Sequence, residues 1–189
     1  MKVLDVVKLT AFYIGQKDLL STTSLGGNTA PTDNQTQTLD ELKACVNDVV
    51  ETIALLYFPL KYEETLQTES GVINFSSFSK NVCEILEVKD KLGFSVDFSV
   101  FPTYLKTSTG EHKFLYHYLP EKIESFSDDL EIFEEKVSLR LVALGVVSRY
   151  YLMQGMFADA DSWQRVFEHT ALALQNRKKN KMIRKRRWL

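Results

Sequence analysis

The feature that most constrains the fold is a change in the period of the hydrophobic pattern partway along the chain. Apolar side chains recur at helical spacing over residues 3–14 and again over residues 39–58. Between Tyr62 and Tyr118 they alternate instead with the two-residue period of strands, and after residue 128 the helical spacing returns. This order predicts an α+β fold with a strand-forming segment inserted between helices.

Four helices are expected, and local signals place their ends. The first covers residues 3–14 and ends at Gly15. Thr38 or Asp40 is expected to cap the second, with Glu41 completing a capping box, and Pro59 stops it. Ser127 or Asp128 is expected to cap a third helix over residues 128–155, and a fourth covers 158–176. Residues 21–38 are almost wholly polar and turn-forming, which predicts a long loop or a mobile arm.

The inserted segment is expected to form a small antiparallel sheet of four to six strands. Strands are predicted at residues 62–66, 72–75, 84–88, 94–100, 104–107 and 113–118, with 84–88 and 94–100 paired as a hairpin. The domain organisation that follows is a single helical domain over residues 1–176, described as a four-helix bundle-like scaffold, with a β insertion at about 62–118. An extended basic C-terminal tail follows at residues 177–189.

Charge divides the chain sharply at residue 177. Eight of the 23 basic residues and none of the 25 acidic residues lie in the tail, so residues 1–176 carry a net charge of −10. The tail ends in two large apolar side chains, and Trp and Arg are enriched at interface hot spots. The predicted partner-binding residues are therefore Arg177, Lys178, Lys179, Lys181, Arg184, Lys185, Arg186, Arg187, Trp188 and Leu189.

Motifs for catalysis or cofactor binding are absent from the sequence. It contains no phosphate-binding glycine loop, no nucleophile elbow and no HExxH zinc motif, so no catalytic residue, cofactor or metal is expected. His112 and His117 are interpreted as turn and strand residues, and Asp128 with Asp129 as helix-capping acids. The aromatic residues of the insertion are interpreted as sheet core and cross-strand pairs. Both cysteines, Cys45 and Cys83, are expected to be buried and unpaired, as in a reducing compartment.

Several segments of the chain together form a recognisable pattern. They are Leu55–Leu60 with Glu63 and Glu64, Gly71–Lys80, Leu115–Pro120, Ala143–Gly145, Tyr150–Leu152, Gly155–Phe157 with Ala160 and Trp163, and Arg186–Trp188. In these segments the sequence resembles a known family, the head-to-tail connector (adaptor) proteins of tailed bacteriophages. The resemblance implies a helical bundle with a β insertion. It also implies a homo-oligomeric ring of about twelve copies. Such a ring binds a portal protein above and a tail or stopper protein below, often through an extended C-terminal segment, and DNA passes through its lumen.

The resulting hypothesis is a virion structural protein rather than an enzyme. It would be assembled in the host cytoplasm, located at the neck of the particle, and docked to portal through residues 177–189. No membrane span is expected because no apolar run approaches about 20 residues. Two rival hypotheses remain open. The eight cations would also suit a nucleic-acid-binding regulatory protein, and an enzyme would require a pocket of convergent polar groups in the sheet region.

Overall fold

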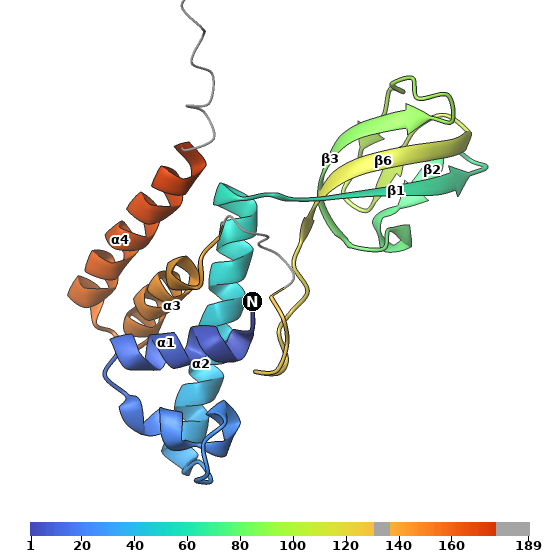
Figure 1. Cartoon of the computed structure of the whole chain (residues 1–189). Coiled ribbons are helices and arrows are strands. Elements are labelled where there is room, and N and C mark those ends of the chain that lie inside the picture. Colours follow the sequence, from blue (N-terminus) through green and yellow to red (C-terminus); the bar gives the residue numbers. More distant parts are fainter. Residues whose placement is uncertain (131–136, 177–189) are drawn as a thin grey trace, which may run out of the picture. The chain divides into compact units, whose positions relative to one another are not determined.

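The computed structural model describes residues 1–130 and 137–176, and it divides the chain into two compact units (Figure 1). The helical unit combines Met1–Ile53 with the described residues from Lys122 onward, and the β unit is the continuous segment Ala54–Glu121. The helices are α1 (Val3–Tyr13), α2 (Asp33–Thr52), α3 (Leu139–Met153) and α4 (Phe157–Asn176). The strands are β1 (Leu60–Thr68), β2 (Val72–Asn74), β3 (Asn81–Asp90), β4 (Ser99–Val100), β5 (Tyr104–Lys106) and β6 (Gly110–Leu119). Helices and antiparallel strands thus form the expected α+β fold.

Helix α3 is the centre of the helical unit. It packs against α1, α2 and α4, and every residue from Leu141 to Ser148 is buried. A helix that is apolar on all sides is one enclosed by its neighbours. Gly145 permits the closest approach, because a Cβ there would lie 2.7 Å from Val49 on α2 and 3.1 Å from the Phe167 ring on α4.

Helix α4 crosses α3 at this glycine and is anchored by polar contacts as well. The Ser148 hydroxyl donates a hydrogen bond of 3.0 Å to the Ala160 carbonyl. The rings of Tyr13 on α1 and Trp163 stack with centroids 5.7 Å apart. Asp159 lies in the first turn of α4, where its carboxylate interacts favourably with the helix dipole.

The amino end of α1 is satisfied by a distant part of the chain rather than by a capping side chain. The amide of Val3 donates to the Asp128 carbonyl at 3.1 Å, and Leu4 donates to Phe126 at 3.0 Å. In return the amide of Leu130 donates to the Met1 carbonyl at 2.7 Å. These bonds satisfy backbone N–H groups of the first helical turn that have no acceptor within the helix. They also hold in place the segment in which the chain returns to the helical unit after the β unit.

The predicted start of the second helix was wrong. Helix α2 begins at Asp33, and Thr32 forms the capping box with Gln35, so Thr38 and Asp40 lie inside the helix. The segment before it is not one long loop, because it contains 3₁₀ turns at Lys17–Ser21 and Thr23–Leu25 with Leu19 and Leu25 buried. The α-helix ends at Thr52 and continues as a π-helical turn, Ile53–Tyr57, that stops before Pro59.

The predicted start of the third helix was also wrong. Ser138 caps α3 by accepting a hydrogen bond of 3.2 Å from the Leu141 amide. Asp128 lies outside any helix, and its carboxylate accepts from the amides of Glu124 and Ser125. Residues 131–136 of the predicted third helix lie outside the described residues.

The β unit contains two three-stranded antiparallel sheets instead of one sheet. The strand orders are β1-β6-β3 and β2-β5-β4. The predicted hairpin of 84–88 with 94–100 is present only in part. The Val96 amide donates a hydrogen bond of 2.9 Å to the Val88 carbonyl, and Lys89 is bridged to Ser95, but β3 pairs mainly with β6, and β4 pairs with β5. The buried core of the unit combines four aliphatic residues with three aromatic ones, and the Phe78 ring lies edge-on to both Phe114 and Tyr116.

Three burial predictions for this unit need correction. His112 is buried rather than exposed at a turn, with its Nε2 lying 2.9 Å from the Ser108 carbonyl. Cys83 is exposed, whereas Cys45 is buried as expected. Phe94, expected in the sheet core, is 68% exposed.

Candidate interaction surfaces

The predicted partner-binding residues, Arg177 to Leu189, lie outside the described residues. Candidate sites in the described part of the chain are therefore sought among exposed apolar side chains, hollows and clusters of polar groups. Exposed apolar side chains are informative when several lie together, because such surfaces mark sites of association.

The most continuous of these surfaces is the connection between α3 and α4, here called the α3–α4 corner, residues 152–157 (Figure 1). Residues 152–159 are all exposed, and four of the six corner residues are large and apolar. Those four are Leu152, Met153, Met156 and Phe157, the last of which is 69% exposed. Methionine side chains adapt to the shape of a partner, so their presence suits a docking surface.

Acidic groups of α2 lie beside the corner. Gln154 donates a hydrogen bond of 2.8 Å to Glu41, and the sulfur of Met153 lies 3.3 Å from the Cys45 thiol. Burial, reinforced by the carboxylates of Asp48 and Glu41 and opposed by Arg149, raises the pKa of Cys45 to about 12. This thiol therefore stays protonated at neutral pH and serves packing rather than chemistry.

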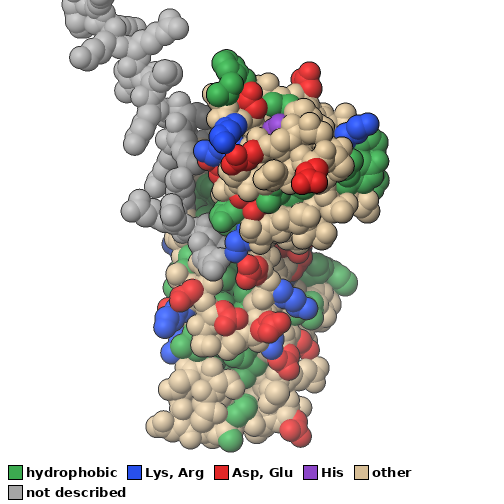
Figure 2. All heavy atoms as spheres, turned by 90° about the vertical axis from the view of Figure 1, so that its right-hand side faces the viewer, with side chains coloured by type: hydrophobic (Ala, Val, Ile, Leu, Met, Phe, Trp, Pro, Cys, Tyr) green, Lys and Arg blue, Asp and Glu red, His purple; other side chains and the backbone are tan. Residues whose placement is uncertain are grey.

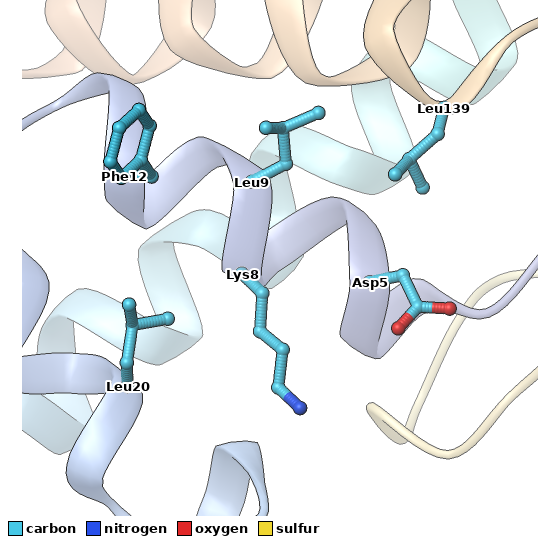
Figure 3. Close-up of a pocket in the computed structure, with 6 residues that line it drawn as sticks. All are labelled: Asp5, Lys8, Leu9, Phe12, Leu20 and Leu139. Atoms are coloured by element: carbon cyan, nitrogen blue, oxygen red, sulfur yellow. The ribbon is translucent and has the colours of Figure 1, made fainter.

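A second surface is an open hollow of about 600 Å³ beside α1, here called the α1 hollow. Figure 3 shows Leu139, at the start of α3, and Leu20 facing α1 from either side. Leu9 and Phe12 add apolar walls, and Asp5 and Lys8 supply the charged lining. Lys17 also lies over the Phe12 ring, 5.6 Å from its centroid.

The β unit exposes further apolar side chains on a tightly held turn after β3. Leu92 is 80% exposed, and its amide and that of Phe94 both donate to the Asp90 carboxylate, at 2.9 and 2.8 Å. Farther along, Phe101 stacks on Tyr104 with ring centroids 4.6 Å apart. In Figure 2 charged side chains of both signs are spread over the face of this unit, and hydrophobic side chains gather at its margins.

A polar cluster inside the β unit holds a loop in place. Glu64 on β1 accepts hydrogen bonds from the Tyr116 hydroxyl on β6 and from the Ser79 hydroxyl, the latter at 2.5 Å. Burial opposes ionisation of Glu64, but the bonds from Ser79 and Tyr116 outweigh it and lower the pKa of the carboxyl. Burial and the neighbouring carboxylate raise the pKa of Tyr116, so its hydroxyl remains a donor. The cluster thus consists of the Glu64 carboxylate, which is charged, and the Ser79 and Tyr116 hydroxyls, which donate hydrogen bonds to it.

A small hollow of about 120 Å³ brings Cys83, Glu84 and His117 together on the β unit. Cys83 is the extra residue of a β-bulge between Val82 and Glu84, which explains its exposure. His117 Nδ1 lies 3.0 Å from the carboxylate of Glu84, its cross-strand neighbour on β3. Among residues 1–130 and 137–176, no three histidine, cysteine or acidic side chains are arranged to hold a metal ion.

No protein-family model matches the chain, and no curated protein is significantly similar to it. In the described part of the chain, no helix combines the length and the apolar character needed to cross a membrane.

Sequence reasoning missed both apolar surfaces of the helical unit. The corner was interpreted only as the end of one helix and the start of the next, with Gly155 as the stop. The available signal was the run Leu-Met-Gln-Gly-Met-Phe, which keeps large apolar residues on both sides of a turn. The α1 hollow had no such signal, because its walls come from three separate segments of the chain.

Proposed function

We propose that the chain is a structural subunit of a bacteriophage virion, a head-to-tail adaptor that forms a ring between the portal and the tail or stopper. The observation that carries the proposal is the exposed apolar surface of the helical unit, where four large side chains project at the α3–α4 corner. A subunit whose role is to assemble needs surfaces of this kind. The resemblance of the sequence to phage adaptors is the reason for proposing a ring between portal and tail or stopper rather than another assembly.

The charge distribution supports the same assignment. Residues 1–176 carry a net charge of −10, and the tail carries eight cations and no acid. A ring of acidic bodies repels the phosphates of DNA, which suits passage of DNA through the lumen without adhesion. The cationic tail then engages an acidic partner surface, with electrostatics fixing orientation and register. Repetition around the ring converts a weak single contact into firm attachment.

Docking of the tail to portal is tested with portal-bearing heads and a chain that ends at Asn176. Because α4 ends there, we expect this variant to fold and to lose attachment to heads, measured by co-sedimentation and electron microscopy. Retained attachment of the truncated chain would contradict the assignment of the tail.

A paired variant separates portal docking from binding to nucleic acid, the alternative function that the basic tail favours. Trp188→Ala with Leu189→Ala keeps all eight cations. If the tail docks in a crevice of portal, this variant loses attachment to heads. If the tail binds DNA through phosphates, the variant binds DNA as the parent does, with a steep dependence on salt. If the parent chain binds DNA in a salt-sensitive way and does not attach to heads, the adaptor function is contradicted and a nucleic-acid-binding regulatory function is favoured.

A further inference from the structure

The α3–α4 corner and the α1 hollow are matched in form and chemistry. The corner projects, because residues 152–159 are all exposed, and its apolar side chains come from one turn. The hollow recedes, with apolar walls from Leu9, Phe12, Leu20 and Leu139. It is too open to enclose a small ligand, since small-molecule sites bury most of the surface of what they bind. Side chains projecting from a protein surface suit it better.

The charges beside the two surfaces are complementary. The carboxylates of Glu41 and Asp159 flank the corner. Lys8 lines the hollow and Lys17 lies over its Phe12 ring, with Asp5 as the acid in the lining. Two corners placed face to face would oppose like charges, which is unfavourable, whereas a corner placed in a hollow pairs carboxylates with ammonium groups.

The two surfaces share no residue, although the hollow extends along α1 from the side of Leu139 toward Phe12. Leu139 opens α3 and Leu152 stands near its end. At 1.5 Å of rise per residue, these positions are roughly 20 Å apart along the helix axis. Residues 152–159 are exposed in the single chain and none of them lines the hollow, so the corner is free to meet the hollow of another copy. Contacts between two different surfaces repeat from copy to copy and generate a ring when the rotation closes.

We infer that copies of this chain associate head to tail, with the α3–α4 corner of one copy seated in the α1 hollow of the next. The inference rests on the proposed ring and names the surfaces that would form it. Four projecting side chains cover only part of the roughly 800 Å² that each partner contributes to a standard interface. A single contact is therefore weak, and the ring forms at high concentration or when a portal collects the copies.

Cysteine cross-linking tests this pairing on the full chain. In a Cys83→Ser background, which removes the exposed thiol, Phe12→Cys is placed in the hollow and Met156→Cys in the corner. We expect mild oxidation to give a dimer only when the two single variants are mixed, and a ladder of multimers when one chain carries both changes. Ala173→Cys, exposed on α4 away from both surfaces, is the matched control and should give no ladder with Phe12→Cys.

Phe157→Asp supplies an independent test that leaves the core intact, because Phe157 is 69% exposed. A carboxylate forced into the apolar hollow should lower the multimer yield more than about tenfold. Val166→Asp, at an exposed position on α4 outside the corner, should leave the yield unchanged. Disulfides within Met156→Cys alone, or an unchanged yield with Phe157→Asp, would overturn the inference.

Electron microscopy of portal-bearing heads separates this inference from the proposed function. Rings on portal without the corner-to-hollow cross-link would overturn the pairing and leave the adaptor function standing. If the cross-link forms but the chain does not attach to heads, the pairing of corner and hollow is supported and the proposed adaptor function is contradicted.

Discussion

The hydrophobic cores of the two units are built from different kinds of side chain. The helical unit buries mainly small aliphatic side chains along α3, and it draws its elements from both sides of the insertion. The β unit is one continuous segment, and its interior is built around Phe78, Phe114 and Tyr116. The difference teaches that the β unit depends on a few large rings, whereas the helical unit depends on close packing at many small contacts.

The largest effects should come from removing one aromatic ring from each unit. Phe114→Ala should destabilise the β unit by about 3–5 kcal/mol, and Phe167→Ala should do the same to the helical unit. A segment as short as residues 54–121 has little stability to lose. We therefore expect Phe114→Ala to unfold the β unit while the helical unit keeps its protection. Hydrogen exchange measured by mass spectrometry reports each unit separately, and loss of protection in both units with either variant would show a single cooperative body.

A smaller effect, confined to the β unit, should follow from Glu64→Gln. The variant weakens the bonds from Ser79 and Tyr116 and should lose about 1–2 kcal/mol at pH 7. Since the folded state lowers the pKa of Glu64, its contribution is present above the ordinary value of 4.5 and is lost as the pH falls through the lowered pKa. Urea midpoints of variant and parent should therefore converge at low pH. Glu63→Gln, which removes an exposed pairing with Lys113, is the matched control and should change the midpoint less.

The smallest of the three effects tests the corrected start of α2. Thr32→Ala removes the capping box and should destabilise the helical unit by about 1 kcal/mol. Thr38→Ala lies inside the helix, where alanine is the better helix former, so it should be neutral or slightly stabilising. Urea unfolding followed by circular dichroism compares the two. The opposite ranking would restore the start that the sequence pattern first indicated.

Sequence patterns predicted the fold class and most of the strand positions because these depend on local alternation and turn residues. They misplaced the starts of α2 and α3 for a specific reason. Both Thr32 with Gln35 and Thr38 with Glu41 satisfy the spacing of a capping box, so spacing alone does not choose between them, and the chain uses the first. Asp128 likewise has the chemistry of a cap, but its carboxylate serves a turn that holds the start of α1.

The candidate surfaces show the same limit more strongly. Pairing of β3 with β6 joins residues far apart in sequence, so the nearby turn indicated only the short pairing of Val88 with Val96 and not the main partner of β3. The exposure of Cys83 follows from a bulge in that pairing, and the α1 hollow follows from three separate segments meeting. Neither the exposure of Cys83 nor the α1 hollow can be predicted from one continuous segment of the sequence. The corner was closer to prediction, because its apolar run is contiguous.

The central position of α3 also governs the order of events during synthesis. The apolar faces of α1 and α2 emerge from the ribosome first, and the helix that covers them is completed only at Met153. At ribosomal rates of about 5–20 residues per second, roughly 5–20 seconds separate the end of α2 from the end of α3. In that interval the β segment is already complete and free to fold. The nascent helices α1 and α2 thus stay exposed to chaperones, and to one another on neighbouring ribosomes, until α3 packs over them.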